Sequence, residues 1–509
     1  MSDANGNAAD YFVARHLREG RGDRIAFADP WRSLTYAELD AASTRFAAGL
    51  KAAGIERERR IALIMLDTID FPIAFWGALR AGVVPIPINT LLPPDIIGYI
   101  LQDSRAAALF ISAPLLEPLK SAARRVGRVV VSHPDGTAAG FSDFPAGRNS
   151  SSIEECSPDE TAFWLYSSGS TGAPKGARHV HSSLKATADT YAATVLKLTE
   201  DDVVFSVAKL FFAYGLGNSM TFPMAAGAST VLFPDRPTPD AVLDIMRRHR
   251  PTLFCGVPTL YAALLAHPEL GRGAGSDRLR LCISAGEPLP EHIGTRWREK
   301  TGCDILDGIG STEMLHIFLS NRPDDIRYGS TGKAVPGYKL RILDNDGNEV
   351  PDGESGELVV RGPSAADGYW NQRNKSRRTF RGEWTHTGDT YTRDADGYYR
   401  YCGRTDDMLK VGGIWVSPFE VEEALIAHPA VLEAAVVGHP DADGLIKPKA
   451  FVVLQESAQH EDRAALAATL QNAVKDRIGV WKYPRWIEFA DTLPKTATGK
   501  IQRYKLRDQ

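Results

Sequence analysis

Two segments far apart in the chain carry residue types suited to binding phosphate. YSSGSTGAPKG, from Tyr166 to Gly176, alternates glycines with hydroxyl side chains and contains Lys175. Glycines let backbone N–H groups approach a phosphate closely, and hydroxyls and a lysine add further donors. The C-terminal LPKTATGKIQRYKL carries Lys500 directly after a glycine. A chain with both segments is expected to bind a nucleotide and to bring a positive charge to it.

The first segment is not the usual nucleotide loop, because that motif has glycine directly before its lysine, whereas Pro174 precedes Lys175. An apolar FWLY run ends at Tyr166 and predicts a buried strand. Ser167 to Gly172 is therefore expected to form a sharp loop leaving a sheet edge. A flexible Ser/Gly linker is the alternative for this composition, but the preceding strand and the embedded lysine argue against it.

Length and charge set outer bounds. With 509 residues the chain exceeds one hydrophobic core, and at least two domains are expected. Its lysines and arginines number 59 and its aspartates and glutamates 63, which gives a net charge of −4. No overall field then recruits nucleic acid or an anionic membrane, and no partner of either kind is expected.

The cysteines and the N-terminus indicate the compartment. The cysteines are odd in number and contain no C-x-x-C pair, which argues against a disulfide framework or zinc site and for reducing surroundings. MSDANGNAAD lacks the basic and apolar parts of a secretory signal. No run approaches the roughly 18 apolar residues of a membrane span. A soluble cytoplasmic protein is expected.

The first part of the chain alternates strand-like and helix-like patterns. Thr35 to Glu38 has the spacing of a capping box, and the apolar period behind it runs to Gly54. IALIML at 61–66 and VVPIPIN at 83–89 predict strands, with a helix between them that closes at Gly82. This rhythm predicts a parallel sheet covered on both faces. Residues 132–160, rich in Ser, Pro, Gly and Asp, are expected to form a surface connection.

From about Tyr338 the pattern changes to short strands separated by the turn signals DNDG and DADG, which predicts an antiparallel β subdomain. The last segment combines strands and a helical stretch from Glu461 to Ile478, which predicts a small α+β domain. The expected fold is a large α/β N-terminal domain, residues 1–404, with parallel-rich sheets and the antiparallel subdomain. Residues 405–509 are expected to form a mobile α+β cap.

Five motifs together carry a resemblance. They are YSSGSTGAPKG, DGIGSTE at 307–313, TGD at 387–389, GRTDDMLKVGG at 403–413 and the closing PKTATGK. In this order the chain resembles the adenylate-forming superfamily of acyl-CoA and aryl-CoA ligases, luciferases and peptide-synthetase adenylation domains. Within it, AKLFFAYGLGNSMTFPM at 208–224 and STEMLHIFLSN at 311–321 are most similar to benzoate-CoA and 4-hydroxybenzoate-CoA ligases.

The resemblance implies a two-step reaction. A carboxylate attacks the α-phosphate of ATP, which gives an aryl-adenylate and pyrophosphate, and the thiol of coenzyme A then displaces AMP. ATP, Mg²⁺ and coenzyme A are the implied cofactors and co-substrates, and a small aromatic acid is the implied substrate. No carrier protein is expected, and the oligomeric state, monomer or homodimer, stays open.

The resemblance also implies catalytic roles. Lys500 matches the lysine that bridges the carboxylate and the α-phosphate. Glu313 would hold Mg²⁺, and the Thr312 hydroxyl would donate to phosphate. The alternatives are a solvated charge for Lys500 and a carboxylate that complements a helix dipole for Glu313.

The remaining implied residues fall into groups. For the β and γ phosphates they are Ser168, Thr171 and Lys175. For the adenine they are Ala285, Gly286, Glu287, Asp307, Gly308 and Ile309, and for the ribose Asp389 and Arg404. Asp406 is the implied hinge, and Lys410, Gly412 and Gly413 would line the coenzyme A tunnel. Phe212 would gate the acid pocket, lined by Ala213, Tyr214, Gly310, His316 and Ile317.

Several alternatives stay open. His316 is equally compatible with a core histidine, and the sequence does not decide whether a para-hydroxyl on the acid is accepted. A medium-chain fatty acyl-CoA ligase would need a longer pocket, and a luciferase-like oxygenase would use the same scaffold. A carrier-loading module is disfavoured. A nucleotide sensor is disfavoured too, because a sensor would be expected to lack Lys500 or Glu313.

Overall fold

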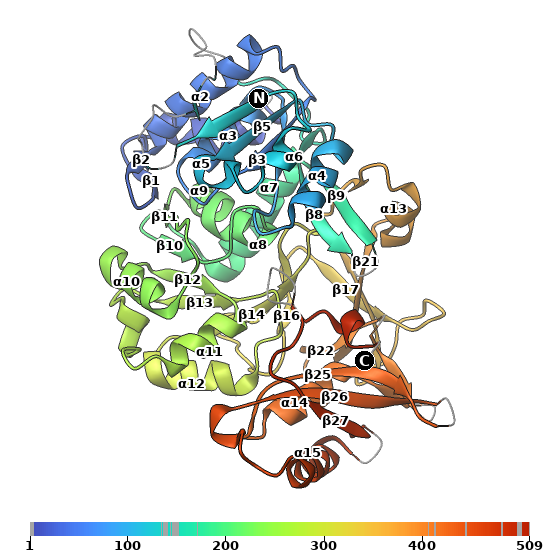
Figure 1. Cartoon of the computed structure of the whole chain (residues 1–509). Coiled ribbons are helices and arrows are strands. Elements are labelled where there is room, and N and C mark those ends of the chain that lie inside the picture. The colour runs from blue at the N-terminus through green and yellow to red at the C-terminus, as the bar shows by residue number, and fades with distance from the viewer. Residues whose placement is uncertain are drawn as a thin grey trace. The chain divides into compact units, whose positions relative to one another are not determined.

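The computed structural model describes residues 5–133, 135, 141–142, 144, 152–169, 172–405, 407–411, 414–442, 445–479, 482–495 and 501–507. Residues 142, 168, 169, 172, 410, 414, 415 and 504 among them are described by their backbone alone. Contacts divide the chain into two compact units, Met1–Leu340 with Val360–His386, and Arg341–Val359 with Thr387–Gln509. Figure 1 shows the course of the chain.

The chain passes between the two units three times, after Leu340, Val359 and His386. The boundary predicted at residues 404–405 lies inside the second unit, so the contact division does not coincide with it. That boundary stays a prediction about where a cap would pivot.

The largest sheet of the described residues has nine strands and belongs to the first unit. Its order is β16-β15-β14-β13-β12-β10-β11-β1-β2, parallel from β14 to β1, with β15, β16 and β2 antiparallel at the edges. The strands are β1 (Ile25–Ala28), β2 (Ser33–Thr35), β10 (Val203–Ser206), β11 (Ser229–Val231), β12 (Leu253–Gly256), β13 (Leu281–Ser284), β14 (Ile305–Gly310), β15 (Ile317–Ser320) and β16 (Lys333–Ala334).

Helices connect these strands and close the core (Figure 1). They are α7 (His181–Thr187), η2 (Ala188–Leu196), α8 (Ala213–Leu216), η3 (Gly217–Thr221), α9 (Phe222–Ala226), α10 (Pro239–His249), α11 (Pro258–Ala266), η4 (Arg272–Gly275) and α12 (Glu291–Thr301), where η2 and η3 are π-helical and η4 is a 3-10 turn. Every residue of β12 and β13 is buried, as expected of parallel strands covered on both faces. Trp297 of α12 packs edge-on against Tyr261 of α11 in this core.

A second sheet of five strands confirms the predicted β-α-β rhythm near the N-terminus. Its order is β4-β3-β5-β6-β7, parallel except for β7, with β3 (Arg60–Ile64), β4 (Val84–Pro87), β5 (Ala108–Ser112), β6 (Val129–Ser132) and β7 (Phe141–Ser142). One face packs on a cluster that includes Trp164, and on the other Phe110 contacts Phe46 of α2. The sheet is therefore covered on both faces, as predicted.

The helices of this region follow their sequence signals. The predicted capping box is present at Thr35 and Glu38, and Gly54 has a positive φ after the helix. The helices are η1 (Asp10–Ala14), α1 (Arg15–Arg18), α2 (Tyr36–Ala52), α3 (Asp70–Arg80), α4 (Pro94–Asp103), α5 (Ala113–Leu116) and α6 (Lys120–Ala123). Of the predicted connection at 132–160, most residues lie outside the described ranges.

The FWLY run lies in a strand, as predicted, but the chain then returns as an antiparallel hairpin. β8 (Thr161–Gly169) pairs with β9 (Gly172–Val180), and β9 pairs with β19 (Gly368–Tyr369). α13 (Arg373–Thr379) and β20 (Phe380–Arg381) follow β19. The hairpin thus carries a segment almost 200 residues further along the chain on its outer edge.

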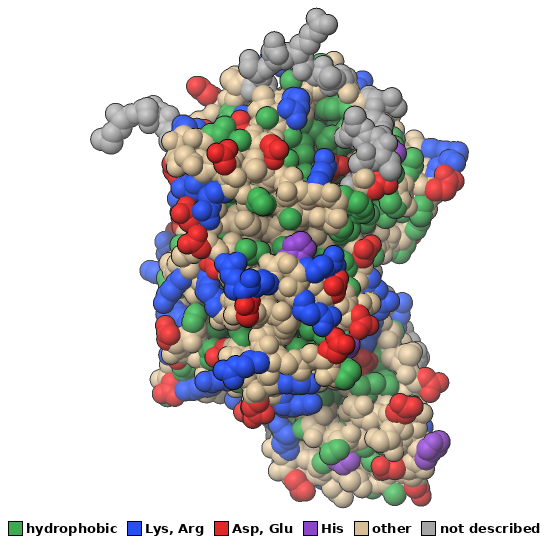
Figure 2. Space-filling view, turned by 90° about the vertical axis from the view of Figure 1, so that its left-hand side faces the viewer, with side chains coloured by type: hydrophobic (Ala, Val, Ile, Leu, Met, Phe, Trp, Pro, Cys, Tyr) green, Lys and Arg blue, Asp and Glu red, His purple; other side chains and the backbone are tan. Residues whose placement is uncertain are grey.

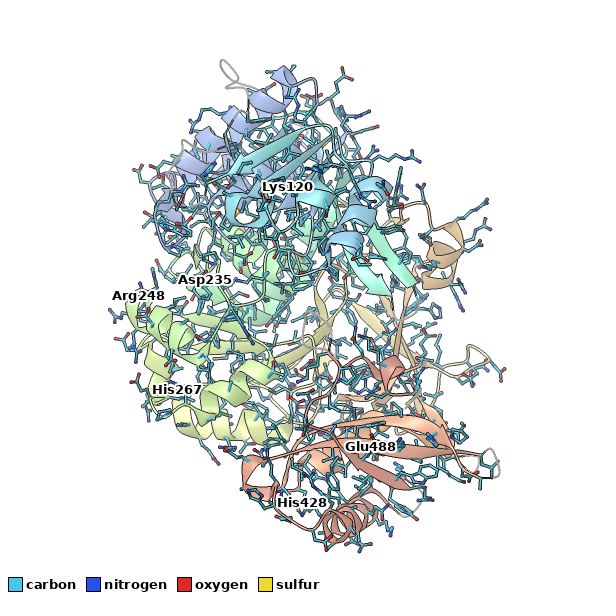
Figure 3. All side chains as sticks on the ribbon, in the orientation of Figure 1. Lys120, Asp235, Arg248, His267, His428 and Glu488 are labelled. Carbon is cyan, nitrogen blue, oxygen red and sulfur yellow. The ribbon has the colours of Figure 1, made fainter. Side chains whose placement is uncertain are left out.

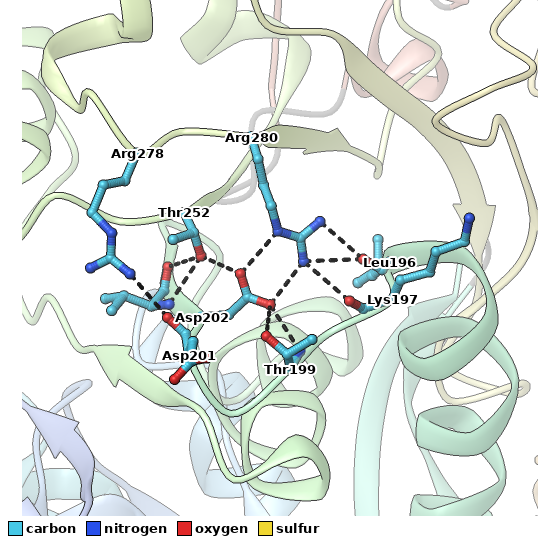
Figure 4. Close-up of polar contacts among 9 residues, drawn as sticks. Leu196, Lys197, Thr199, Asp201, Asp202, Thr252, Arg278 and Arg280 are labelled. Carbon is cyan, nitrogen blue, oxygen red and sulfur yellow. Dashed lines mark hydrogen bonds and ion pairs between the residues drawn. The ribbon is translucent and has the colours of Figure 1, made fainter.

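A buried carboxylate joins the amino-terminal ends of three neighbouring strands (Figure 4). Asp202 precedes β10 and accepts from the Thr252 hydroxyl and from the Arg280 guanidinium, which precede β12 and β13. Arg280 also donates to the carbonyl of Leu196, where η2 ends. Burial alone would raise the pKa of Asp202, but Arg280 and Thr252 hold it below its usual value. This network stabilises the amino-terminal ends of these strands, where none of the predicted site residues lies.

The predicted antiparallel strands lie mainly in the second unit, with β20 in the first. β18 pairs with β17 and β21, and β21 also pairs with β20 and β22, with bounds β17 (Lys339–Leu343), β18 (Ser355–Arg361), β21 (Trp384–Arg393) and β22 (Tyr399–Arg404). The DADG signal forms the turn between β21 and β22, where Gly397 N–H donates to the Asp394 carbonyl. The hairpin predicted at DADG is confirmed.

The C-terminal part of this unit is an α+β fold, as predicted. Its strands are β23 (Leu409–Val411), β24 (Ile414–Val416), β25 (Val431–Pro440), β26 (Ile446–Leu454) and β27 (Trp486–Phe489). Its helices are α14 (Pro418–Ile426), η5 (Glu456–Ala458), α15 (Arg463–Ile478) and η6 (Arg503–Lys505). Leu425 of α14 and Leu470 of α15 pack with Val436 and Val452 against one face of the β25-β26-β27 sheet.

The surface and the cysteines bear on the composition argument. Basic and acidic side chains are intermixed on the face of the protein shown in Figure 2.

All five cysteines are unpaired, although Cys282 Sγ lies 3.8 Å from Cys303 Sγ in the core. Within the described ranges, no helix has both the length and the apolar character needed to cross a bilayer.

Candidate functional site

The predicted acid and adenine residues leave the carboxyl ends of neighbouring strands. β10 leads to Phe212, β13 leads to Ala285, and β14 itself carries Asp307 to Gly310. Ser284 pairs with Asp307 across β13 and β14, so these ends are level. Because ligands of open α/β sheets bind at the carboxyl ends of the strands, this edge is the candidate site.

Tyr214 closes this edge from α8. Its hydroxyl lies 3.2 Å from the carbonyl oxygen of Gly256 and 3.1 Å from that of Ile283. A phenol hydroxyl carries one proton, so it donates to one of these carbonyls at a time. Tyr214 therefore ties the segment after β10 to the ends of β12 and β13, and Phe212 and Ala213 are positioned with it at the start of α8.

His316 is buried among aromatic rings. Its ring centroid lies 4.4 Å from that of Phe222, 5.4 Å from Tyr191 and 5.7 Å from Tyr214. Its Nε2 lies 3.3 Å from the carbonyl of Tyr214, and its Nδ1 has no partner among the described residues. Burial lowers the pKa of His316 to about 3, so the ring is neutral near pH 7. His316 is therefore compatible with both interpretations, because it is a core histidine whose ring also lies beside the predicted pocket residue Tyr214.

Two glycines leave room for His316. A Cβ at Gly217 would lie 2.3 Å from His316 Cδ2, and one at Gly310 would lie 2.5 Å from the His316 carbonyl oxygen. Gly217 opens the π-helix η3, a form that often marks functional sites. Ile317 follows at the start of β15 and is buried beside Gly308.

The adenine residues lie at the ends of β13 and β14. Ala285 is buried, Gly286 has φ +94°, and Glu287 follows them in the loop. Gly308 and Ile309 pair with β15 through their backbone. Asp307 is 6% exposed, and burial raises its pKa well above the usual value.

A tight turn links the acid and phosphate residues. Leu315 adopts φ +64°, which a leucine rarely does, and Leu315 N–H donates to the Thr312 carbonyl. His179 Nε2 lies 2.8 Å from the same carbonyl and can only donate to it. The turn thereby places Glu313 on one side and His316 on the other, three residues apart.

Lys175, Glu313 and Tyr369 form a closed triangle of polar contacts. Lys175 Nζ donates to the Tyr369 hydroxyl at 2.7 Å, and that hydroxyl donates to Glu313 Oε1 at 2.6 Å. Lys175 Nζ lies 3.1 Å from the same Oε1. Burial would raise the pKa of Glu313, but Lys175 and Tyr369 outweigh it and hold the pKa below its usual value. Glu313 is therefore an anion at neutral pH.

Tyr369 was not predicted as a site residue. Its only signal in the sequence is an aromatic residue in the polar segment GYWNQR. β19 brings it to the hairpin, where Tyr369 pairs with Ala177.

A second unpredicted pair holds the segment before Phe212. The buried carboxylate of Asp67 accepts from the backbone N–H of Leu210. Lys209 Nζ donates to the carbonyls of Phe233 and of Asp235, the residue labelled in Figure 3. Burial raises the pKa of Asp67 to about 6, and the Lys209 charge opposes that rise. Both residues fix the path from β10 to α8.

The predicted ribose residues form their own pair in the second unit. Arg404 Nη1 lies 3.1 Å from Asp389 Oδ1 and also donates to the Thr387 carbonyl. A Cβ at Gly388, which has φ +69°, would lie 2.7 Å from the Arg404 guanidinium. The TGD motif thus places glycine where arginine approaches the backbone.

Several predicted residues lie outside what the structure describes. Thr171, Asp406, Gly412, Gly413 and Lys500 are outside the described ranges, and Ser168 and Lys410 are described by backbone alone. The chain on either side is described. Asp407 pairs with Arg503 and Arg507, and Arg503 forms a 2.7 Å ion pair with the buried Glu422. These contacts anchor the segment that follows Lys500.

The edge of the sheet, with its charged triangle and its hydroxyl-rich hairpin, defines a nucleotide-binding α/β protein. The AMP-binding enzyme family matches residues 14–370, and the AMP-binding enzyme C-terminal domain matches residues 420–500. The chain belongs to the AMP-binding enzyme family, which confirms the resemblance stated from its motifs.

Similar proteins extend over the whole chain. A 4-hydroxybenzoate-CoA/benzoate-CoA ligase of Rhodopseudomonas palustris is 53% identical, over 99% of this chain and 94% of its own. A benzoate-CoA ligase of Thauera aromatica is 52% identical, over 98% and 95%. The crystal structure of a benzoate CoA ligase from Burkholderia xenovorans LB400 superposes with a TM-score of 0.88 at 50% identity, over 98% of this chain and 99% of that one.

The packing of His316 predicts the effect of Gly217→Ala. The added methyl would overlap the imidazole, and relieving such an overlap typically costs about 1–3 kcal/mol. We expect urea unfolding to show a loss in this range, and the KM of the acid substrate expected in this pocket to rise by roughly tenfold. Gly127→Ala, whose methyl would meet nothing within 4 Å, is the matched control. Equal stability of both variants would contradict the packing argument.

The buried histidines predict acid sensitivity. Burial lowers the pKa of His179 to about 4, from the 6.5 of an unfolded chain. The unfolded state therefore takes up its proton first as the pH falls, and stability present above pH 6.5 is lost toward pH 4. His179 alone should cost about 2 kcal/mol between pH 7 and 5, measured by urea unfolding. His179→Gln should reduce this loss and the exposed His460→Gln should not. An unchanged slope in His179→Gln would refute the assignment.

Proposed function

We propose that this protein ligates a benzoate-type aromatic acid to coenzyme A through an aryl-adenylate, with ATP cleaved to AMP and pyrophosphate. Benzoate and 4-hydroxybenzoate are the proposed substrates, and small para-substituted benzoates are included. The named activities of the two relatives that are more than 50% identical support this proposal.

One observation carries the proposal. The turn from Thr312 to His316 presents an anion, Glu313, beside the β8-β9 hairpin, and an aromatic-lined histidine beside Tyr214. A reaction that joins an aromatic carboxylate to a phosphate needs both kinds of surface close together in space. A flat ring fits a slot walled by Tyr214 and His316, with Gly310 and Ala213 as small residues.

The chain's own groups supply charge neutralisation rather than a covalent nucleophile. A carboxylate oxygen attacks the α-phosphorus, and the bond from that phosphorus to the pyrophosphate oxygen breaks. Lys175 and the Thr312 hydroxyl would neutralise and bind the phosphates, with Ser168 and Thr171 as further donors. The thiolate sulfur of coenzyme A then attacks the carbonyl carbon, and the oxygen of AMP leaves. Phe212 would separate the acid pocket from the thiol path.

Mg²⁺ fits the residues present. Among the described residues no group of three or more His, Cys, Asp or Glu converges on a possible metal position. Mg²⁺ is commonly held by one or two carboxylates together with substrate phosphates and water. Glu313, an anion beside the β8-β9 hairpin, would be that carboxylate. When bound, the ion would neutralise charge on the phosphates.

The second unit would complete the chemistry. Lys500 would bridge the carboxylate and α-phosphate during adenylation, and rotation about Asp406 would then bring Lys410, Gly412 and Gly413 to the thiol path. Asp389 and Arg404 would bind the ribose hydroxyls, and Ala285–Glu287 with Asp307–Ile309 the adenine. We also propose a cytoplasmic enzyme, monomer or homodimer, that needs no carrier protein. The predicted cap boundary at 404–405 belongs to this proposal.

A pyrophosphate-release assay tests the substrate class. Benzoate, 4-hydroxybenzoate, 4-methylbenzoate, 2-aminobenzoate, cinnamate and octanoate should be compared with ATP and coenzyme A. We expect benzoate or 4-hydroxybenzoate to give the highest kcat/KM and octanoate at least roughly 100-fold less, because Tyr214 and His316 shorten the slot. A preference for octanoate would support a medium-chain acyl-CoA ligase instead, and oxygen uptake would support an oxygenase.

The lysine assignment predicts a split between the half-reactions. Lys500→Ala should lower adenylate formation from acid and ATP by roughly 100-fold or more, because the charge at the α-phosphate is lost. It should spare thioester formation from supplied aryl-adenylate. Lys495→Ala is the control. Lys495 lies five residues before Lys500 and pairs with Glu433. Equal loss of both half-reactions in a folded Lys500→Ala variant would refute this division.

A further inference from the structure

Lys175, Glu313 and Tyr369 form the triangle of polar contacts, and Tyr369 is its uncharged member. Its hydroxyl has a single proton and two lone pairs. Lys175 has only donors and Glu313, as an anion, has only acceptors, so the direction of the contacts is fixed. Lys175 donates to Tyr369, and Tyr369 donates to Glu313.

The ring of Tyr369 is held in place from several sides. Tyr369 is 4% exposed and packs on Phe380 with ring centroids 5.4 Å apart. Its backbone N–H donates to the Ser376 hydroxyl at 2.9 Å, and the next residue, Trp370, donates to the Gly176 carbonyl. Ala366 N–H donates to the Glu313 carbonyl at 2.8 Å. The strand that carries Tyr369 is thus fastened to the backbone of both partner segments.

Lys175 and Glu313 must exchange partners if both bind a nucleotide. In the described arrangement they neutralise each other at 3.1 Å. With MgATP bound, the ammonium would turn to phosphate oxygens, and Glu313, whose side chain is 15% exposed, would exchange this partner for Mg²⁺. A buried anion without a donor is costly. A hydroxyl fixed 2.6 Å away keeps one donor on Glu313 throughout the exchange.

We propose that Tyr369 is a positioning residue for nucleotide binding, which holds Glu313 and orients Lys175 so that the ammonium can pass from the carboxylate to the phosphates of ATP. This inference rests on the proposed function for its nucleotide. It concerns ATP binding alone and does not depend on which acid is ligated.

Tyr369→Phe tests the proposal because it removes one oxygen and keeps the ring. We expect MgATP to bind roughly tenfold more weakly, as for a lost hydrogen bond to a charged group, measured by equilibrium dialysis without acid or coenzyme A. The KM of MgATP should rise while the KM of the acid stays within about twofold. Tyr328→Phe removes a hydroxyl that contacts Asp304 in the same unit and should leave MgATP binding unchanged.

A double-mutant cycle separates positioning from general structure. In a background with both Lys175→Met and Glu313→Gln, adding Tyr369→Phe should weaken MgATP binding by less than about threefold, because both charged groups that the hydroxyl positions are gone. The same tenfold loss in both backgrounds, or wild-type affinity in Tyr369→Phe, would overturn the proposal. If Tyr369→Phe melted well below the wild type, Tyr369→His would replace it in the same cycle.

The two proposals fail in different ways. A wild-type protein that binds MgATP but releases no pyrophosphate with any benzoate would refute the substrate assignment and leave the role of Tyr369 standing. Normal aryl-CoA formation with an unaffected MgATP affinity in Tyr369→Phe would do the reverse.

Discussion

A mostly shielded carboxylate that must stay charged, that of Glu313, is the constraint on which the candidate site depends. Burial favours the neutral acid, and Glu313 remains an anion because an ammonium and a hydroxyl contact the same oxygen. Those groups come from a hairpin near residue 175 and a strand near residue 369, on either side of Glu313 in the sequence. The three-stranded β8-β9-β19 sheet exists in the place where these segments meet. Its short edge strand carries Tyr369, whose hydroxyl donates to Glu313.

The two ends of the large parallel sheet differ in how the buried polar groups are hydrogen-bonded. At the amino-terminal ends Asp202, Thr252 and Arg280 form a network whose partners are all within the protein. At the carboxyl ends polar groups such as Asp307 Oδ1, Ser284 Oγ and His316 Nδ1 are buried without partners among the described residues. Satisfied polar groups stabilise, whereas unsatisfied ones cost free energy unless a ligand or water meets them. These three atoms all lie at the edge of the sheet proposed to bind the ligands, although buried atoms without described partners, such as Trp76 Nε1 and Trp297 Nε1, also occur elsewhere.

Local signals predicted local structure well. The capping box at Thr35, the turn at Asp394 to Gly397 and the continuous apolar strands each depend on neighbours within a few residues. Tyr369 and Asp67 could not be found this way, because their partners are 194 and 143 residues away. His316 was left between two interpretations, since a sequence does not tell which ring nitrogen meets a carbonyl. The roles of Lys500 and Asp406 remain predictions, as both residues lie outside the described ranges.

The three crossings of the chain between its units have a consequence for synthesis on the ribosome. Residues 341–359 of the second unit emerge before residues 360–386, which the first unit still needs. The first unit therefore lacks Tyr369 until that return segment has left the exit tunnel. Meanwhile β18 waits, without its partner β21, for residues made later. Neither unit can be completed as an independent module in order of translation, so the nascent chain must carry two unfinished sheets at once.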